Sequence, residues 1–334
     1  MTAHERCTVL VTGGTGFVGS HLVERLVALG YRVRCLVRRT SSLVYLPEGK
    51  VELAYGELAT GAGLLEAVEG SELVFHVAGV TKAHSAAAYY QGNLQGTENL
   101  LGALAGSGNQ TARFVHVSTL AAIGPSPDGK PLTEDVPPHP LTHYGRSKLG
   151  AEEALRRSPV RANAVIVRPP VVYGPRDTDV FKMFRAVRRG LLVRIGGQER
   201  FFSIVHVQDL VEGLLAAARG GRGEARAYFI ANPRPVSWAE FGTAAAEVMG
   251  RGVRTVCVPR QAAYALAWLA EAGARIRGRP SIISREKVAE AECPFWTCDT
   301  SRAQAELGFS TQKSLREGIE ETLSWYKIVG WLKY

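Results

Sequence analysis

The sequence lacks the features that mark secreted, membrane-spanning and disulfide-stabilised proteins. Its 334 residues include only five cysteines, an odd number, scattered at Cys7, Cys35, Cys257, Cys293 and Cys298. This usage argues against a disulfide framework, and no histidine cluster accompanies Cys293 and Cys298 to suggest zinc. No apolar run approaches the length of a membrane span, and the first predicted strand leaves no room before it for a signal peptide. We therefore expect no metal, reduced thiols and a cytoplasmic protein.

Acidic residues are in the minority, with 31 Asp and Glu against 40 Lys and Arg, so the net charge is +9. The basic residues occur in small groups and not in one long run, and no aromatic residues alternate with them. This pattern indicates a solvated basic surface and no nucleic-acid partner. The composition, 46% hydrophobic and 21% charged, is that of a globular protein. The chain is long enough for one large domain or two packed domains.

A glycine-rich stretch near the start carries the first functional pattern. The apolar run Val9–Val11 predicts a strand buried on both faces of a parallel sheet. Gly13, Gly16 and Gly19 follow at three-residue intervals, and a helical apolar stripe then runs to Gly30. Glycines between a buried strand and a helix N-terminus allow a tight turn and a close approach of the backbone to a pyrophosphate. The stretch therefore predicts nucleotide binding.

The chain then alternates between strand and helix patterns, which predicts an α/β fold with a Rossmann-like, doubly wound parallel sheet. Further strands are expected at Arg32–Val37, Val51–Tyr55, Glu72–Ala78, Arg113–Thr119 and Ala164–Arg168, and helices at Gly61–Val68, Ala86–Ala105 and His143–Arg157. We expect a dinucleotide-binding domain at residues 1–171, to which residues 201–231 return. Residues 172–200 and 232–334 are expected to form a smaller C-terminal α+β substrate-binding domain.

The end of the second predicted strand bears on the choice of cofactor. Folds that prefer NAD carry an acidic residue near this point, where it binds the adenosine ribose. Here Arg38 and Arg39 follow the strand, and no acidic residue occurs before Glu48. An arginine pairs well with a ribose 2′-phosphate. We therefore favour NADP(H), with NAD(H) as the alternative; a simple surface role or stacking on adenine also remains open for Arg38.

A second group of chemical side chains lies between Ser118 and Lys148. Tyr144 and Lys148 are four residues apart in a predicted helix, so they share one face. A nearby ammonium stabilises a phenolate, so we expect Lys148 to lower the pKa of Tyr144. The hydroxyls of Ser118 and Thr119 fall at the carboxyl end of a predicted strand, the edge of a parallel sheet where ligands bind.

Together these residues resemble the extended short-chain dehydrogenase/reductase family, within the NAD-dependent epimerase/dehydratase superfamily. The resemblance covers nearly the whole chain and is strongest to the branch of 3β-hydroxysteroid dehydrogenases and dihydroflavonol reductases. It rests on the glycine stretch, Ser118–Thr119 and the Tyr144–Lys148 pair. Further segments that match the family are 56–58, 76–79, 93–101, 168–176 and 205–210.

The resemblance implies a role for each matching position. Tyr144 is expected to act as general acid or base, Lys148 to bind the nicotinamide ribose, and Thr119, preceded by Ser118, to bind the substrate oxygen. Asn93 is expected either to support a proton relay or to anchor its helix. The implied cofactor-binding set is Gly13, Thr15, Gly16, Phe17, Val18, Gly19, Arg38, Glu57, Leu58, Ala78, Tyr144 and Lys148. A homodimer through the helices 86–105 and 143–157 is also implied.

The substrate class is weighed between two branches of the family. A largely apolar ketone or secondary alcohol, such as a steroid, flavonoid or 3-oxo-lipid, is favoured because the apolar segment Val258–Arg275 with Pro280–Ser284 is similar to that branch. A nucleotide-sugar epimerase is the first alternative, but Phe202 stands where those enzymes carry a diphosphate-binding arginine, and Arg200 lies two residues earlier. Leu120–Ala121 after Thr119 argues against dehydratase chemistry.

Two further questions stay open at this point. A non-catalytic, NADP-sensing relative is the second alternative, disfavoured because Thr119, Tyr144 and Lys148 are all present. Within the segment Val258–Arg275, Tyr264 and Trp268 share one helical face, which either packs inward, lines the pocket or contacts a membrane surface. We therefore expect a small-molecule substrate and no integral membrane span, with peripheral membrane contact left open.

Overall fold

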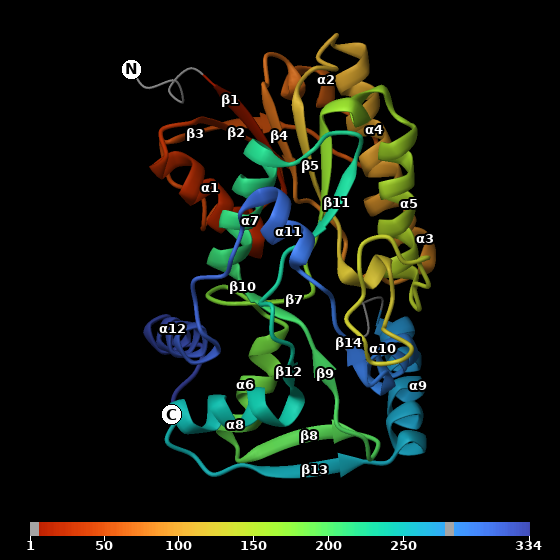
Figure 1. The fold of residues 1–334 in the computed structure, drawn as a ribbon, viewed down its shortest axis with the longest axis vertical. Coiled ribbons are helices and arrows are strands. Elements are labelled where there is room, and N and C mark those ends of the chain that lie inside the picture. The colour runs from red at the N-terminus through yellow and green to blue at the C-terminus, as the bar shows by residue number, and fades with distance from the viewer. Residues whose placement is uncertain (1–6, 278–283) are drawn as a thin grey trace.

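The computed structural model describes residues 7–277 and 284–334 (Figure 1). Most of the segment Pro280–Ser284, which supported the resemblance to hydroxysteroid dehydrogenases, lies outside the described residues. The sheet-containing part and a second part of mixed short elements stack along the long axis of the molecule, with the central sheet at one end in Figure 1.

Seven parallel strands of the described chain form the central sheet, in the order β11-β6-β5-β4-β1-β2-β3. The strands are β1 (Thr8–Thr12), β2 (Arg32–Val37), β3 (Val51–Tyr55), β4 (Leu73–His76), β5 (Arg113–Val117), β6 (Ala164–Arg168) and β11 (Arg226–Phe229). The order reverses between β1 and β4, which is the topology of a doubly wound sheet. The predicted α/β, Rossmann-like fold is therefore confirmed.

Helices cover both faces of this sheet because its strands are apolar on both sides. On one face, Val9 and Val11 pack with Leu22 of α1 and Leu214 of α7; on the other, Leu10 packs against α2, α4 and α5. The helices are α1 (Phe17–Ala28), α2 (Leu64–Val68), α3 (Ala86–Tyr89), α4 (Gly96–Gly106), α5 (His143–Arg157), α7 (Val207–Gly220) and α11 (Ser301–Leu307). The carboxyl ends of the strands face the second part of the chain (Figure 1).

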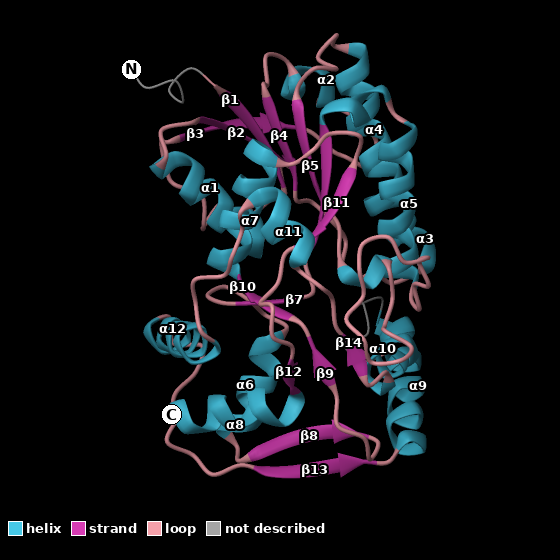
Figure 2. Cartoon of the chain, in the orientation of Figure 1, coloured by secondary structure: helices cyan, strands magenta, loops and turns pink. Residues whose placement is uncertain are grey.

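The second part combines short strands with helices (Figure 2). These elements surround an apolar core of their own, which includes Phe184, Phe241 and Tyr326. Its strands are β7 (Val171–Tyr173), β8 (Leu191–Ile195), β9 (Phe201–Phe202), β10 (Ile204–His206), β12 (Val236–Ser237), β13 (Arg254–Val258) and β14 (Phe295–Trp296). Its helices are α6 (Val180–Arg188), α8 (Trp238–Val248), α9 (Arg260–Arg277), α10 (Arg285–Glu292) and α12 (Leu315–Ile328). The predicted domain boundary at residue 171 stays a prediction.

One predicted helix is interrupted. In place of a regular helix over Ala86–Ala105, α3 and α4 are joined by a π-helical segment at Tyr90–Gln95. A π turn carries one extra residue and often occurs at functional sites. It shifts the register of the helix so that Asn93 lies buried within the segment, its amide bonded to the chain after β4. The apolar periodicity of the segment could not reveal this shift.

Candidate active site

The glycine turn after β1 is closed by backbone packing that only glycine permits. Gly13 has a φ of +73°, and a Cβ there would lie 2.6 Å from the amide nitrogen of Ala78. A Cβ on Gly19 would overlap the carbonyl oxygen of Gly13. No side chain caps the N-terminus of α1 at Gly16. A bare helix N-terminus beside a side-chain-free turn fits the pyrophosphate of a dinucleotide.

A buried chain of hydrogen bonds holds the strand ends around this turn. The hydroxyl of Thr12 lies 2.7 Å from Nδ1 of His76, and Nε2 of the same ring lies 2.9 Å from the hydroxyl of Thr97. The amide of Ala78 donates to Thr12 at 3.3 Å. Burial lowers the pKa of His76 to about 3, so the ring is neutral and serves as a fixed link between β1, β4 and α4. This fixes Ala78 against the glycine turn.

The residues predicted to bind the adenosine end of the cofactor lie at neighbouring strand ends. Arg38 follows β2 and is exposed, and Glu57 follows β3, which pairs with β2 through Val37 and Tyr55. The guanidinium of Arg39 instead lies over the ring of Tyr55, 5.3 Å from its centre. Of Arg38 and Arg39, it is therefore Arg38 whose guanidinium is available for a ligand at this edge.

The remaining predicted cofactor contacts are backbone features of the same edge. The carbonyl of Leu58 accepts a hydrogen bond from Asn99 at 2.7 Å, which ties the turn after β3 to α4. Thr15 lies in the glycine turn, and Phe17 and Val18 form the first turn of α1. The predicted cofactor-binding residues of this edge thus follow the carboxyl ends of β1, β2, β3 and β4, which are neighbours in the sheet.

Thr119 and Tyr144 form the hydroxyl pair predicted for catalysis. They are joined by a hydrogen bond. Thr119 starts the turn after β5, where its hydroxyl also accepts from the amide of Ala121 at 3.2 Å. Tyr144 is the second residue of α5, a helix capped by Thr142, whose hydroxyl accepts from the amide of Gly145 at 3.2 Å. The cap fixes the start of the helix and so the position of the phenol.

The expectation that Lys148 lowers the pKa of Tyr144 is wrong for this structure. Burial raises the pKa of Tyr144 to about 12, although its hydrogen bond to Thr119 acts in the other direction. The ammonium of Lys148 donates to the carbonyl of Val117 at 2.8 Å. Burial lowers the pKa of Lys148 to about 8. The phenol is therefore protonated at neutral pH, and the ammonium of Lys148 is bound to the carboxyl end of β5.

Ser118 lies beside Thr119 in the sequence but faces another partner. Its hydroxyl donates to Oε1 of Glu152 at 2.5 Å, inside the protein. Glu152 also accepts from Arg168 at 2.9 and 2.6 Å, and both side chains are almost completely buried. Burial alone raises the pKa of Glu152, but the charge and hydrogen bonds of Arg168 hold it below its usual range. Ser118 thus belongs to an ion-pair network that supports the catalytic edge from within.

Asn93 uses its side-chain amide to join two elements of the site. Its Oδ1 accepts from the amide of Val80 at 2.6 Å, and its Nδ2 donates to the Val80 carbonyl at 3.1 Å and to the hydroxyl of Ser147 at 2.8 Å. These contacts connect the chain after β4 to α5, which carries Tyr144. Of the two expected roles, the observed bonds are those of an anchor; the relay role stays a prediction.

Two glutamates on α10 were not foreseen as part of the site. Glu290 accepts a hydrogen bond from the Thr142 hydroxyl at 3.1 Å, and Glu286 accepts from the amide of His143 at 3.2 Å. Both carboxylates therefore sit at the N-terminus of α5, where the helix dipole favours negative charge. Glu290 also acts on Tyr144, since its charge raises the pKa of the phenol. No local pattern marks this contact, because it joins residues about 150 positions apart.

An apolar cavity of about 240 Å³ lies near α10 in the second part. Trp296, which lines it, donates from its indole nitrogen to the carbonyl of Glu290 at 2.9 Å. Because Glu290 also accepts from Thr142, α10 connects the cavity to the start of α5. Its remaining lining residues are Val171, Asp179, Val180, Met183, Arg200, Phe201, Phe202, Ile204, Trp238, Phe241 and Cys293. Phe202, which we predicted to stand where sugar-nucleotide enzymes carry an arginine, lines this apolar space.

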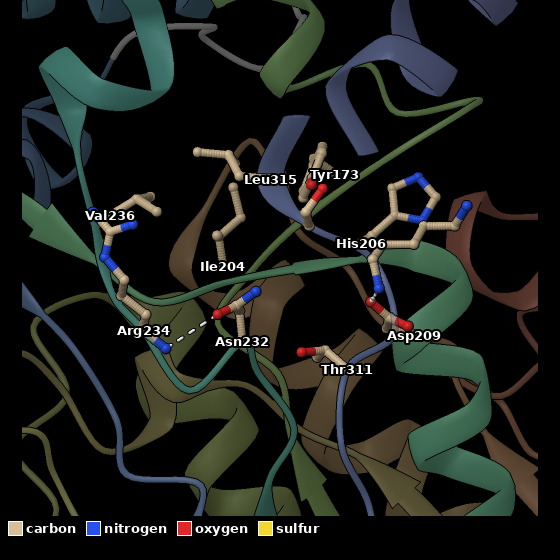
Figure 3. A pocket seen from close by; sticks show the side chains of 11 residues that line it. Tyr173, Ile204, His206, Asp209, Asn232, Arg234, Val236, Thr311 and Leu315 are labelled. Atoms are coloured by element: carbon tan, nitrogen blue, oxygen red, sulfur yellow. Dashed lines mark hydrogen bonds between the residues drawn. The ribbon is translucent and has the colours of Figure 1, made fainter. Parts of the chain in front are cut away.

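A second cavity, of about 220 Å³, is polar and lies between β7, β10 and the start of α12 (Figure 3). Its charges already have protein partners: Arg234 pairs with Glu240 and Lys313 with Glu321. Asp209 accepts from the amides of Gln312 and Lys313 at 3.0 and 3.2 Å. None of the predicted site residues lines this cavity, so the motif at 205–210 acts here as a structural clamp.

A doubly wound sheet with a glycine turn and a Thr–Tyr–Lys set defines the class of short-chain dehydrogenase-like proteins. The model of the NAD dependent epimerase/dehydratase family matches residues 9–231, so the chain belongs to this family. The predicted resemblance is thereby confirmed.

Several relatives match almost the whole chain. A ceramide reductase of Caulobacter vibrioides is 31% identical, over 99% of this chain and 98% of that protein. A 4-hydroxy-2-methyl-3-oxo-4-farnesyl-3,4-dihydroquinoline-1-oxide ketoreductase of Stigmatella aurantiaca is also 31% identical, over 93% and 94%. The solved structure of gox2253 superposes with a TM-score of 0.81 and 28% identity, over 98% of this chain and 99% of that one.

These similarities bear on the predicted activity. The curated relatives named here are reductases of one family, which confirms the prediction of an oxidoreductase. No helix within residues 7–277 and 284–334 is long and apolar enough to cross a membrane.

Proposed function

We propose that the protein is an NADPH-dependent ketoreductase of a largely apolar substrate. The observation that carries this proposal is the apolar cavity of the second part, which α10 links to the start of α5. It is bordered by Phe201, Phe202, Trp238 and Trp296. Aromatic and aliphatic walls gain free energy by excluding water from an apolar ligand, and they offer little to a sugar diphosphate. The names of the relatives from Caulobacter and Stigmatella, a ceramide reductase and a farnesylated quinoline ketoreductase, support the same substrate class.

The chain's own residues divide the chemistry as follows. When bound, the nicotinamide supplies the hydride. The protonated phenol of Tyr144 donates to the ketone oxygen, and Thr119 gives a second hydrogen bond to the same oxygen as negative charge develops there. The glycine turn holds the pyrophosphate, and Lys148 the nicotinamide ribose. Because the pKa of Tyr144 is about 12, the phenol is protonated at neutral pH. A protonated phenol can donate to the oxygen of a ketone, so this state favours reduction.

The proposed preference for NADPH rests on the edge formed by β2 and β3. Arg38 is exposed there with its guanidinium available, whereas Arg39 is engaged by Tyr55. No acidic side chain follows β2 before Glu48, so nothing at that position binds a ribose 2′-hydroxyl in the manner of NAD-specific folds.

The proposal extends to the surroundings of the enzyme. Residues 172–200 and 232–334 supply the substrate-binding domain. Five free cysteines suit a cytoplasmic enzyme, and α5 with the preceding helical segment is the proposed homodimer face.

On α9 the large apolar side chains Leu266, Trp268 and Leu269 are more than half exposed, while Ala263 and Ala267 face the protein. We propose that this outward face, on a chain of net charge +9, contacts an anionic lipid surface.

Comparison of the wild type with Tyr144→Phe tests the proposed function. Oxidation of NADPH is followed with a panel of 3-oxoacyl compounds, oxosteroids and flavanones, and separately with UDP- and GDP-sugars. We expect turnover of at least one apolar ketone, lost in Tyr144→Phe while NADPH affinity stays nearly unchanged. Retained activity in Tyr144→Phe would remove this residue from its role. Epimerisation of a nucleotide sugar without net NADPH consumption would establish the alternative activity.

A further inference from the structure

Two lysines share a single carboxylate oxygen at the rim of the apolar cavity. The ammonium groups of Lys82 and Lys182 each lie 2.7 Å from Oδ1 of Asp179. Lys82 belongs to the segment after β4, on the sheet side, whereas Asp179 and Lys182 belong to the start of α6. The cluster therefore joins the carboxyl edge of the sheet to the second part of the chain. One carboxylate compensates only one of these two charges.

The charge of a third lysine acts on the same cluster. Lys287, on α10, is half-buried, and its pKa is lowered by burial and by Lys82 and Lys182 while Asp179 acts in the opposite direction. The carboxylates of its own helix, Glu286 and Glu290, are directed at the N-terminus of α5, although Glu290 also acts to raise the pKa of Lys287. Within the described chain Lys287 makes no ion pair. Two ammonium groups thus bind Asp179, and a third interacts with the cluster through its charge.

This charge lies at the solvent-facing rim of the apolar cavity: the side chain of Asp179 is 52% exposed and that of Lys182 is 44% exposed. Asp179 lines the cavity, and so do Val180 and Met183, which follow it on α6. Two lysines that share one carboxylate leave a net positive charge at this rim, and that charge attracts a ligand anion. A ligand that fits both features has an apolar body and an anionic group.

We propose that Lys82, Lys182 and Lys287 form a subsite for the anionic group of the substrate, a carboxylate or a phosphate, while its apolar body fills the cavity. This inference rests on the proposed function, because that function identifies the ligand as the substrate. Asp179 holds the lysines together in the free protein and competes with the ligand anion for them.

Arg200 is the cation among the residues that line the cavity itself, and it has a different task. Its guanidinium donates to the carbonyl of Ala291 at 2.7 Å and lies over the ring of Trp238, 4.8 Å from the centre. It therefore forms part of the wall between α10 and α8. The lysines, each on a flexible stem around a shared carboxylate, are the groups free to rearrange around an anion.

Binding of three ligands with the same tail tests the subsite without relying on turnover. Decanoate, decyl phosphate and decanol, each below its critical micelle concentration, are titrated calorimetrically into the NADPH-saturated protein at pH 7.5. We expect at least one anion to bind about tenfold or more tightly than decanol. A hydrogen bond to a charged group contributes more free energy than a neutral one, and the difference corresponds to about this change in affinity. The better of the two anions identifies the group as carboxylate or phosphate.

Variants assign the preference to the lysines. Lys182→Met and Lys287→Met should bring the anion to the affinity of decanol and leave decanol unchanged, whereas Lys50→Met, at the opposite edge of the sheet, should change neither. Asp179→Asn removes the competing carboxylate and should tighten anion binding; a purely structural cluster predicts weaker binding of all three ligands.

Several results would overturn the subsite. These are equal affinities of the three ligands for the wild type, loss of decanol binding together with anion binding in the lysine variants, or loss of the preference only in Arg200→Met. An intact preference for the anion combined with no turnover of any ketone would refute the proposed function and leave the subsite standing.

Discussion

Arg168 and Glu152 form a two-bond ion pair inside the protein, with donor–acceptor distances of 2.9 and 2.6 Å. Ser118 adds a third hydrogen bond to the same carboxylate. The pair joins β6 to α5, and the bond from Ser118 ties the end of β5 to the same helix. Together these contacts fix the position of Thr119, which follows Ser118, relative to the helix that carries Tyr144. Its main effect is on position, because a buried pair contributes little net stability.

Removing one partner of this pair should be strongly destabilising. Glu152→Leu leaves the guanidinium of Arg168 buried without a counter-charge, and we expect a loss of about 3–5 kcal/mol in the free energy of unfolding. The double variant Glu152→Leu/Arg168→Met should recover most of this loss. Denaturant unfolding measures both.

The neighbouring residue supplies the control. Glu153 lies on the same helix and forms only an exposed contact with Arg157 at 3.9 Å. Glu153→Leu should change stability by less than about 1 kcal/mol. Equal losses for Glu152→Leu and Glu153→Leu would contradict a special role for the buried pair.

The glycine turn gives a prediction about cofactor binding. A Cβ on Gly19 would overlap the Gly13 carbonyl, so Gly19→Ala should displace the turn and weaken NADPH binding by more than an order of magnitude. Gly102 is the matched control, because it lies within α4 with no atom within 4 Å of an added Cβ. Gly102→Ala should leave NADPH affinity unchanged and stabilise the protein by about 0.5–1 kcal/mol. Fluorescence titration and thermal unfolding separate the two effects.

The pKa of Lys148 predicts how stability depends on pH. The ordinary value is 10.5, and burial lowers it to about 8 in the folded protein. Between these values the unfolded chain binds more protons, so this group makes stability rise with pH over that window. The cost of burying the charged form, present below pH 8, is about 3 kcal/mol from the size of the shift.

Comparison with Lys148→Met isolates this contribution from other groups that titrate in the same range. The variant should be more stable than the wild type near neutral pH, and the difference should shrink between about pH 8 and pH 10.5. Chemical unfolding at several pH values measures the difference. A difference that is independent of pH would show that Lys148 is not the source.

The sequence predicts those helices and strands whose bounds are set by residues close together in the chain. The predicted bounds of β6 and α5 agree with the structure because apolar runs and helix caps such as Thr142 are local. The glycine turn and the Tyr144–Lys148 spacing were recognisable for the same reason. The sequence could not show that Ser118 bonds to Glu152, since this contact joins residues 34 positions apart on different elements.

The remaining features depend on long-range packing. Burial decides the pKa of Tyr144, and no spacing in the sequence reports how deeply the phenol is covered. The contact of Glu290 with Thr142 and the convergence of Lys82, Asp179 and Lys287 join segments far apart in the chain. Such contacts arise only once the second part of the chain is folded over the sheet edge.

Arg38 should determine the preference for NADPH. Loss of its guanidinium removes the proposed partner of the 2′-phosphate, so Arg38→Ala should weaken NADPH binding about tenfold or more and change NADH binding little. Arg39→Ala is the control, since that side chain already lies over Tyr55. Dissociation constants for both cofactors measure the ratio. Equal binding of NADPH and NADH by the wild type would refute the role of Arg38.

The outward face of α9 predicts binding to anionic vesicles. Trp268 is 58% exposed, as is Leu269, and Leu266 is 56% exposed. Replacing all three by serine removes the apolar area that would enter the headgroup region, so co-sedimentation with phosphatidylglycerol-containing vesicles should be lost. Wild-type binding should weaken in high salt and on pure phosphatidylcholine, because part of it is electrostatic.

Ile328→Ser serves as the control, because Ile328 on α12 is the most exposed of the large apolar side chains within the described residues, at 83%, and lies outside α9. It should bind vesicles like the wild type. The mass in solution is measured in parallel by light scattering. If the triple variant changes a dimer into a monomer and neither protein binds vesicles, this face of α9 is a contact between subunits, and the lipid surface is excluded as its partner.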